Sequence, residues 1–253
     1  MSGECTAVER TLLSRFGRVM RDDVITDAIF DLDDTLCDFR MARERGIAEA
    51  LALLPGECRR TAAEIWRRQE PQLFAAFAAK RISRREYRWQ RFHLVLAELA
   101  LGPGAAHEER ELITAMNRAF MREINVGVTA TDGAHACLAA LGGQGVRCHL
   151  LTNGPSDSQR LRLKRLGLDA FLERVFVAEE IGTFKPDPAA FRIAVESIGQ
   201  PPGRIVMIGD DLEADILPAL GAGLRAIHFA PAGSGFRPNV RHLREILPEI
   251  ASL

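Results

Sequence analysis

Five short runs of β-branched and aliphatic residues recur along the chain, and polar residues or glycine end each of them. Runs of this kind are typical of strands that are buried on both faces of a parallel sheet. Because consecutive parallel strands need a crossover between them, this feature constrains the fold more than any other. The runs are Val24–Asp31, Val146–Thr152, Val175–Ala178, Arg204–Gly209 and Leu224–Ala230.

Helical patterns separate the later runs, and a glycine stands where each of these helices should stop. Glycine readily adopts the left-handed conformation that ends many helices. The alternation of strands and helices predicts an α/β fold, here a doubly wound, Rossmann-like parallel sheet. The predicted helices are Ser156–Leu166, Pro188–Ile198 and Leu212–Ala219, with Gly167, Gly199 and Gly221 at their ends.

The stretch Asp38–Asn125 holds no candidate strand, and alanine, leucine, arginine and glutamate recur there with helical spacing. Breaks are expected at Pro55, at Pro71 and at residues 102–104, which would divide the stretch into about four or five helices. An all-helical block that interrupts an α/β pattern after its first strand predicts an inserted cap domain.

These patterns set the expected domain boundaries. Residues 1–36 and 126–253 would form the α/β core, and residues 37–125 the helical cap. For residues 1–23 two interpretations stay open, one amphipathic helix or an ordered tail.

Composition excludes several classes of protein. The 253 residues carry a formal net charge of -1 at pH 7, which gives no global attraction to nucleic acid or to anionic membranes. No stretch approaches the roughly 18 apolar residues that a membrane span needs. The five cysteines lie far apart without a Cys-x-x-Cys pair, which favours reduced thiols over a disulfide framework or a zinc site. We therefore expect a cytoplasmic protein, monomeric or homodimeric, without a nucleic-acid or membrane partner.

Two carboxylates follow the first predicted strand directly. Asp31 and Asp33 are separated by one residue in the stretch Asp-Leu-Asp-Asp-Thr. In open parallel sheets, ligands bind at the carboxyl ends of the strands, so one carboxylate could attack as a nucleophile while the other transfers a proton. The alternative is an aspartate-rich turn that caps a helix or faces solvent.

Polar residues also follow the second and third predicted strands. Thr152, Asn153 and Gly154 offer a hydroxyl and backbone N–H groups that could hold an anion near a helix start, or they could form an ordinary capped turn. Lys185 precedes the next helix and could neutralise a phosphoryl group, or it could be an exposed loop lysine. Taken singly, each of these two clusters fits the structural alternative better.

An acidic cluster ends the fourth predicted strand. Asp210 and Asp211 follow that strand, and Asp215 lies five residues beyond Asp210. Converging carboxylates repel one another unless a hard cation lies among them, and oxygen ligands suit Mg²⁺; the alternative is an acidic loop without a metal. All four polar clusters stand directly after predicted strands and would meet along one sheet edge, which favours a joint catalytic site.

The segments FDLDDTLCDF, LLTNG, FKPDP and IGDDLEAD, in this order, resemble the haloacid dehalogenase superfamily of hydrolases. The helical insert after the first segment is similar to the subfamily with a helical-bundle cap, and the resemblance covers about residues 25–230. It implies a Mg²⁺-dependent phosphatase that hydrolyses a small-molecule phosphate monoester. Small-molecule phosphatases such as pyrimidine nucleoside 5′-monophosphatases and N-acylneuraminate 9-phosphatases are similar, and sugar phosphates are further candidates.

The resemblance also implies roles for individual residues. Asp31 would be the nucleophile that forms an aspartyl-phosphate, and Asp33 the general acid and base. Phosphate would be bound by Thr152, Asn153, Gly154 and Lys185, and Mg²⁺ by Asp31, by Asp33 through its backbone carbonyl, and by Asp210. Asp215 would support the site. Asp211 stands where relatives often carry serine, so its role is left open between a metal partner and a local change of charge.

Three other functions remain open for the same residues. Dehalogenation of a 2-haloacid attacks carbon and needs neither Mg²⁺ nor an acid for the leaving group, so Asp33 and Asp210 argue against it. A phosphomutase would keep the same core residues, and a catalytically silent binding module would not need them.

A series of arginines marks the predicted cap. Arginine recurs every three or four residues, with aromatic residues between, and this spacing places a basic stripe on one helix face. The stripe could form a wall that attracts an anionic ester, or it could be a solvated helix face, which is the more common case. Its members are Arg81, Arg84, Arg85, Arg88 and Arg91.

Overall fold

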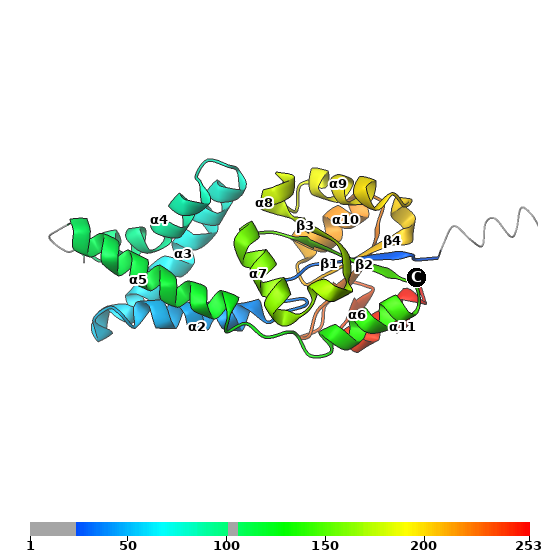
Figure 1. The fold of residues 1–253 in the computed structure, drawn as a ribbon, viewed down its shortest axis with the longest axis horizontal. Helices are drawn as coiled ribbons and strands as arrows, with labels where there is room; N and C mark the ends of the chain where they lie inside the picture. The colour runs from blue at the N-terminus through cyan, green and yellow to red at the C-terminus, as the bar shows by residue number, and fades with distance from the viewer. Residues whose placement is uncertain (1–23, 101–105) are drawn as a thin grey trace, which may run out of the picture.

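A computed structural model describes residues 24–100 and 106–253, and in it six parallel strands form one sheet (Figure 1). The sheet order is β3-β2-β1-β4-β5-β6, in which the chain winds outward from β1 in both directions. The predicted α/β class with a doubly wound parallel sheet is therefore confirmed. The strands are β1 (Asp27–Phe30), β2 (Arg147–Thr152), β3 (Leu172–Val177), β4 (Ile205–Gly209), β5 (Arg225–Phe229) and β6 (Asn239–Val240).

Helices cover both faces of this sheet, because neighbouring residues of each strand point to opposite sides. Phe30 belongs to one buried cluster, which α6 (Ala134–Gly143), α7 (Ser156–Leu166) and α11 (Ile246–Ile250) complete. Ile29 belongs to the other cluster. The helices on that second face are α9 (Pro188–Ile198) and α10 (Leu217–Gly221), while α8 (Ala178–Ile181) follows β3.

The register of the central strands brings their ends to a common edge. Phe30, the last residue of β1, lies beside Leu150 of β2 and Ile208 of β4. The residues that follow these positions therefore emerge together: Asp31 directly after β1, Thr152 at the end of β2, and Asp210 directly after β4. This alignment sets the place of the candidate site.

Two of the three predicted core helices have the predicted bounds. Helices α7 and α9 match, and Gly167 and Gly199 end them with φ of 64° and 74°. The third helix, expected over Leu212–Ala219, is instead a π-helical segment η4 (Leu212–Ile216) followed by α10. Helix α6 was not predicted, because its alanines, leucines and glycines lack an amphipathic pattern, and β6 is only two residues long.

Four α-helices between β1 and α6 form a separate layer in the described part of the chain, which we call the helical layer (Figure 1). A buried cluster of its own, with Trp66, Phe92 and Phe120, holds these helices together. None of the described helices is long and apolar enough to cross a membrane. The four helices are α2 (Phe39–Leu51), α3 (Arg59–Ala78), α4 (Arg84–Glu98) and α5 (Ala106–Asn125).

The expected break at Pro71 is wrong, because α3 continues through it. Proline removes one backbone hydrogen bond from a helix, and here Pro71 lies on the exposed side of α3, where water can reach the freed carbonyl. Trp66, Leu73 and Phe77 are buried on the packed side of α3, before and after the proline, and their packing holds the helix continuous. The break predicted at residues 102–104 and the alternatives for residues 1–23 lie outside the described residues.

Candidate active site

Lys185 lies buried between two carboxylates at the edge of the sheet. Its Nζ donates to Asp31 Oδ1 at 2.6 Å and to Asp215 Oδ1 at 2.5 Å. Burial by itself lowers the pKa of the Lys185 ammonium, but the carboxylates of Asp215 and Asp31 outweigh this and hold the pKa above its ordinary value. The lysine is therefore a permanent cation beside Asp31.

The loop that carries Lys185 is anchored by the neighbouring strand end. Asn153 follows β2, and its Nδ2 donates to the Lys185 carbonyl oxygen at 2.8 Å. The Lys185 backbone N–H donates to Asn153 Oδ1 at 2.9 Å. The Asn153 side chain thus sets the position of the Lys185 backbone. Thr152, the residue before Asn153, is fully buried and lines the same cavity.

Three carboxylates form a cluster that could hold a metal ion. One oxygen each from Asp31, Asp210 and Asp215 lies within 4.8 Å of the others. Burial, together with the negative charges of Asp31 and Asp215, raises the pKa of Asp210 to about 7. A divalent cation would relieve this repulsion, and a set of carboxylate oxygens is the donor chemistry that Mg²⁺ prefers. The residues present therefore fit Mg²⁺.

Gly209 at the end of β4 is required for this arrangement. A Cβ atom at this position would collide with the carboxylate of Asp215. The glycine thereby lets Asp215, which follows on η4, fold back against the strand end. The Asp211 side chain caps the same segment, because its Oδ1 accepts from the backbone N–H of Glu213 at 2.8 Å and of Ala214 at 3.0 Å.

Asp33 faces a different set of partners from Asp31. Arg162 Nη2 donates to Asp33 Oδ2 at 3.1 Å, and Gln159 Nε2 donates to the same oxygen at 3.2 Å. Burial raises the pKa of Asp33, with the guanidinium of Arg162 opposing the rise. The two carboxylates of the first motif therefore occupy distinct environments, as a nucleophile and a proton carrier require.

Sequence reasoning missed Arg162 and Gln159. Both belong to α7 and lie three residues apart, so they share a helix face. Arg162 is only 2% exposed and stacks over the ring of Phe39 at 4.4 Å. The three-residue spacing of Gln159 and Arg162, on the helix that directly follows Thr152 and Asn153, could have pointed to them. The spacing alone, however, does not distinguish a buried arginine from a solvated one.

The arginine stripe of the sequence divides into separate environments. Helix α4 begins at Arg84, so Arg81 is not on it, and Arg85 is exposed. Arg88 forms two hydrogen bonds of 2.8 and 2.7 Å with Asp157 at the start of α7, and Arg84 lies 3.3 Å from the same carboxylate. These two arginines tie the helical layer to the core. The last member of the stripe is buried inside the layer.

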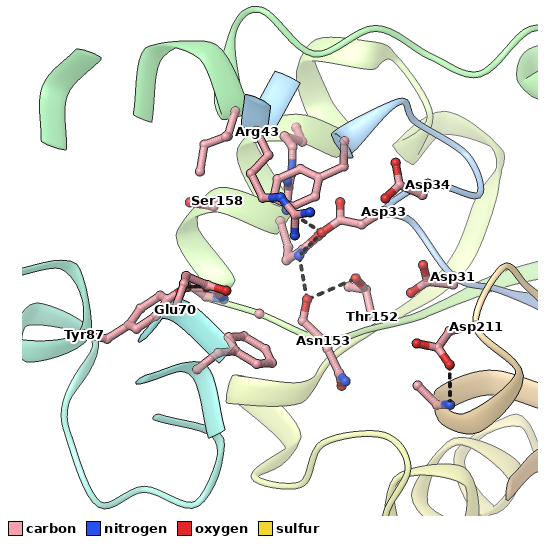
Figure 2. Close-up of a pocket in the computed structure, with 18 of the residues that line it drawn as sticks. Asp31, Asp33, Asp34, Arg43, Glu70, Tyr87, Thr152, Asn153, Ser158 and Asp211 are labelled. Atoms are coloured by element: carbon pink, nitrogen blue, oxygen red, sulfur yellow. Dashed lines mark hydrogen bonds and ion pairs between the residues drawn. The ribbon is translucent and has the colours of Figure 1, made fainter. Parts of the chain in front are cut away.

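A single cavity of about 350 Å³ brings the predicted residues together. Asp31, Asp33 and Thr152 line it from the sheet edge, and Glu70 and Tyr87 line it from the helical layer (Figure 2). The site residues predicted from sequence that line this cavity are Asp31, Asp33, Thr152, Asn153, Gly154, Lys185, Asp210, Asp211 and Asp215.

A doubly wound parallel sheet with acidic and basic side chains gathered in one cavity at its carboxyl edge is the architecture of an α/β enzyme. Residues 28–223 match the family model of haloacid dehalogenase-like hydrolases, so the chain belongs to this family and is a hydrolase.

Known proteins are similar over different lengths of the chain. The ribulose-1,5-bisphosphate 5-phosphatase of Halopiger xanaduensis is 30% identical over 82% of this chain and 85% of that protein. The pyrimidine 5′-nucleotidase YjjG of Escherichia coli is 36% identical, but the match spans 43% of this chain and about half (48%) of that protein. The magnesium-bound structure of the HAD-hydrolase YfnB from Bacillus subtilis has a TM-score of 0.67 and 26% identity, over 90% of this chain and 99% of that one.

Proposed function

We propose that this hydrolase is a Mg²⁺-dependent phosphatase that cleaves a small phosphate monoester in the cytoplasm through an aspartyl-phosphate intermediate. The observation that carries the proposal is the position of Asp31, which follows β1 in the cavity and is bonded to the cation of Lys185. Phosphatases among the similar proteins support the same reaction class. The helical layer, within residues 37–125, would act as the cap over the core.

In the first step the Asp31 carboxylate attacks phosphorus and forms an oxygen–phosphorus bond. The bond from phosphorus to the alcohol oxygen breaks, and Asp33 gives its proton to that oxygen. Lys185 and the hydroxyl of Thr152 stabilise the negative charge on the phosphoryl oxygens, a form of electrostatic catalysis that is effective in a water-poor cavity. The raised pKa of Asp33 favours the protonated form that this step needs.

In the second step Asp33, now ionised, accepts a proton from a water molecule. That water attacks phosphorus, the bond between phosphorus and Asp31 breaks, and inorganic phosphate leaves. Arg162 stabilises the ionised Asp33 through its hydrogen bond to Oδ2. Gln159 fixes the same carboxylate oxygen, so the proton carrier stays in place through both steps.

Asp31 and Asp210, with Asp215 beside them, would hold Mg²⁺ in the cavity. When bound, Mg²⁺ supplies positive charge that neutralises the phosphoryl group. The chain itself contributes Lys185, whose two ion pairs keep Asp31 and Asp215 close together.

The three alternative functions account for Asp33 and Lys185 less well than a phosphatase does. Dehalogenation releases a halide, which needs no proton, yet Asp33 is held inside the cavity by Arg162 and Gln159. A phosphomutase would return the phosphoryl group to its sugar, and no feature of the described residues favours this over transfer to water. A silent binding module would gain nothing from a buried Lys185 between two carboxylates, which is costly to maintain.

The test compares three aspartate-to-asparagine variants of the first motif. Asp31→Asn should abolish turnover, because no covalent intermediate can form. Asp33→Asn should slow hydrolysis of alkyl phosphates by about 10²–10⁴-fold, the usual contribution of a general acid and base. Asp38→Asn is the matched control: its exposed side chain accepts from the Met41 backbone N–H and does not line the cavity, so the variant should stay within about fivefold of wild type.

A second readout locates the intermediate. With p-nitrophenyl phosphate the leaving group needs little protonation, so Asp33→Asn should release a burst of nitrophenol and accumulate phosphorylated enzyme. Mass spectrometry after acid quenching should find the phosphate on the peptide that contains Asp31. Phosphate on another residue, or near-normal turnover by Asp31→Asn, would refute the mechanism.

A further inference from the structure

The cavity extends beyond the reacting groups into the helical layer. There apolar and aromatic side chains line it together with four charged ones, Arg43, Glu70, Arg88 and Arg91. Apolar walls with a small number of placed polar groups are the usual make-up of a small-molecule site. At about 350 Å³ the cavity is at the small end of such sites, so the part of the ester that enters it is a small one. The apolar lining from the helical layer consists of Phe39, Trp66, Phe74, Phe120, Met121 and Ile124.

Arg91 is a buried cation on this wall. Its side chain lines the cavity although the residue is only 3% exposed. One edge of the guanidinium, Nε and Nη2, donates to Asn117 Oδ1 at 3.0 and 2.8 Å, and the group lies 4.2 Å from the ring centre of Phe120. Both partners are neutral. Among the described residues, no carboxylate lies within 4.0 Å of Arg91.

Glu70, the carboxylate on the same wall, forms its hydrogen bond with Tyr87 and not with Arg91. Glu70 Oε1 accepts from the Tyr87 hydroxyl at 2.6 Å, and Figure 2 shows these two side chains together, on the opposite side of the cavity from Asp31. Burial lowers the pKa of Arg91 to about 10, with Tyr87 and Glu70 partly opposing the shift. Arg91 therefore carries its charge at neutral pH.

Trp66 supplies a second donor on this wall, and this donor lacks a hydrogen-bond partner in the part of the chain that the structure describes. The indole Nε1 of Trp66 is buried without a hydrogen-bond acceptor among the described residues, and Trp66, 3% exposed, lines the same cavity. A buried donor without an acceptor costs about 1–3 kcal/mol, and a buried charge without a counter-charge costs more. Two such costs on one cavity wall are explained if the cavity receives an anion.

We propose that the alcohol part of the substrate carries a carboxylate, which binds Arg91 and the indole N–H of Trp66 in the helical layer. This inference rests on the proposed phosphatase activity. The carbon skeleton of the alcohol packs on the aromatic walls, and its phosphate end reaches Asp31. A planar carboxylate matches the guanidinium fork. Arg43 and Arg88 also line the cavity, but Arg88 is already paired with Asp157, and Arg91 is the most deeply buried of the three arginines. A second phosphate would bring two negative charges close to Glu70, which repels them.

The experiment uses matched pairs of esters in which one member has a terminal carboxylate and the other an isosteric methyl group. Alcohols of two to five carbons cover the length of the cavity. For the best pair, kcat/KM of the wild-type protein should favour the carboxylate at least tenfold. Arg91→Gln should reduce this ratio to within threefold of unity. Arg85→Gln removes an exposed arginine of the same helix, outside the cavity, and should leave the ratio unchanged.

A milder variant keeps the test decisive if Arg91→Gln does not fold. Trp66→Phe keeps an aromatic ring on the wall but removes the N–H donor, and should lower the carboxylate preference by about threefold or more. Wild-type protein that hydrolyses p-nitrophenyl phosphate but shows no carboxylate preference would overturn this inference and leave the phosphatase proposal intact. So would a preference for esters with a second phosphate. Absence of phosphatase activity on all esters would overturn the phosphatase proposal instead.

Discussion

Replacing Lys185 with methionine tests how the buried charges stabilise the fold. In the wild-type protein Lys185 lies 2.6 Å from Asp31 and 2.5 Å from Asp215, and all three residues are buried. Methionine has a similar length and no charge. The variant therefore leaves two buried carboxylates next to each other without their shared cation, in a cavity where Asp210 adds a third.

The expected loss of stability is large. Unit charges about 4 Å apart attract by about 4 kcal/mol at an effective dielectric constant near 20, and both contacts of Lys185 are shorter than that. The cost of burying the ammonium offsets part of this attraction, and removing one partner of a buried ion pair typically destabilises by about 3–5 kcal/mol. We expect a loss in this range for Lys185→Met at pH 8 in the presence of a chelator.

The loss should depend on pH in one direction. The pKa of Asp215 is raised above its ordinary value of 3.8 mainly by burial, with Lys185 opposing the rise, so removal of Lys185 raises it further. A carboxyl group with a raised pKa in the folded state stabilises the fold below its unfolded pKa, and that stability is lost as the pH rises through the folded pKa. The penalty of Lys185→Met should therefore be largest at pH 8 and fall to less than half at pH 5.

The assay is chemical denaturation of the wild-type protein, Lys185→Met and Lys164→Met at pH 5, 6.5 and 8. Lys164 is an exposed lysine on α7, so its replacement controls for the loss of one positive charge and should change the free energy of unfolding by less than about 0.5 kcal/mol. A loss below 1 kcal/mol for Lys185→Met at pH 8, or a loss that is independent of pH, would refute the reasoning.

Two further predictions concern the same edge of the sheet. Mg²⁺ should raise the thermal unfolding temperature more at pH 8 than at pH 6, because the pKa of Asp210 is raised to about 7 and metal ligands bind in their ionised form; equal shifts at both pH values in scanning fluorimetry would contradict the assignment of the carboxylate cluster. Gly209→Ala should destabilise by at least about 2 kcal/mol, a typical cost of overpacking, because the new Cβ would collide with Asp215. Gly142→Ala, in α6 with no atom within 4 Å of the new Cβ, should be neutral or stabilising by up to about 1 kcal/mol, and equal denaturation midpoints for the two variants would count against the collision.

Much of the fold could be predicted because it depends on local patterns. The apolar runs around Ile29 and Met207 are buried strands, and α7 and α9 begin and end at the predicted residues. The break expected at Pro71 failed for a physical reason. Local propensity disfavours proline inside a helix, but the packing of Trp66, Leu73 and Phe77 on the buried side of α3 outweighs the lost hydrogen bond.

The candidate site was predictable to the extent that it follows from strand ends. Asp31, Thr152 and Asp210 come directly after or at the end of buried parallel strands, and such ends meet at one edge in any sheet of this kind. Their residue types, read together, were enough to expect an anion and a cation there.

Tertiary structure alone decided which side chains complete the site. Arg162 meets Asp33 across 129 positions of the chain, and Arg91 became a buried cation only because α4 packs its arginine between Asn117 and Phe120 of α5. Helical periodicity is the same for a solvated arginine and a buried one. The sequence therefore predicts that both arginines lie on helices, but it does not predict their burial or their partners. The position and burial of the strands follow from short-range hydrophobic patterns, whereas the partner of a charged side chain depends on which distant segments the completed fold brings within a few ångströms.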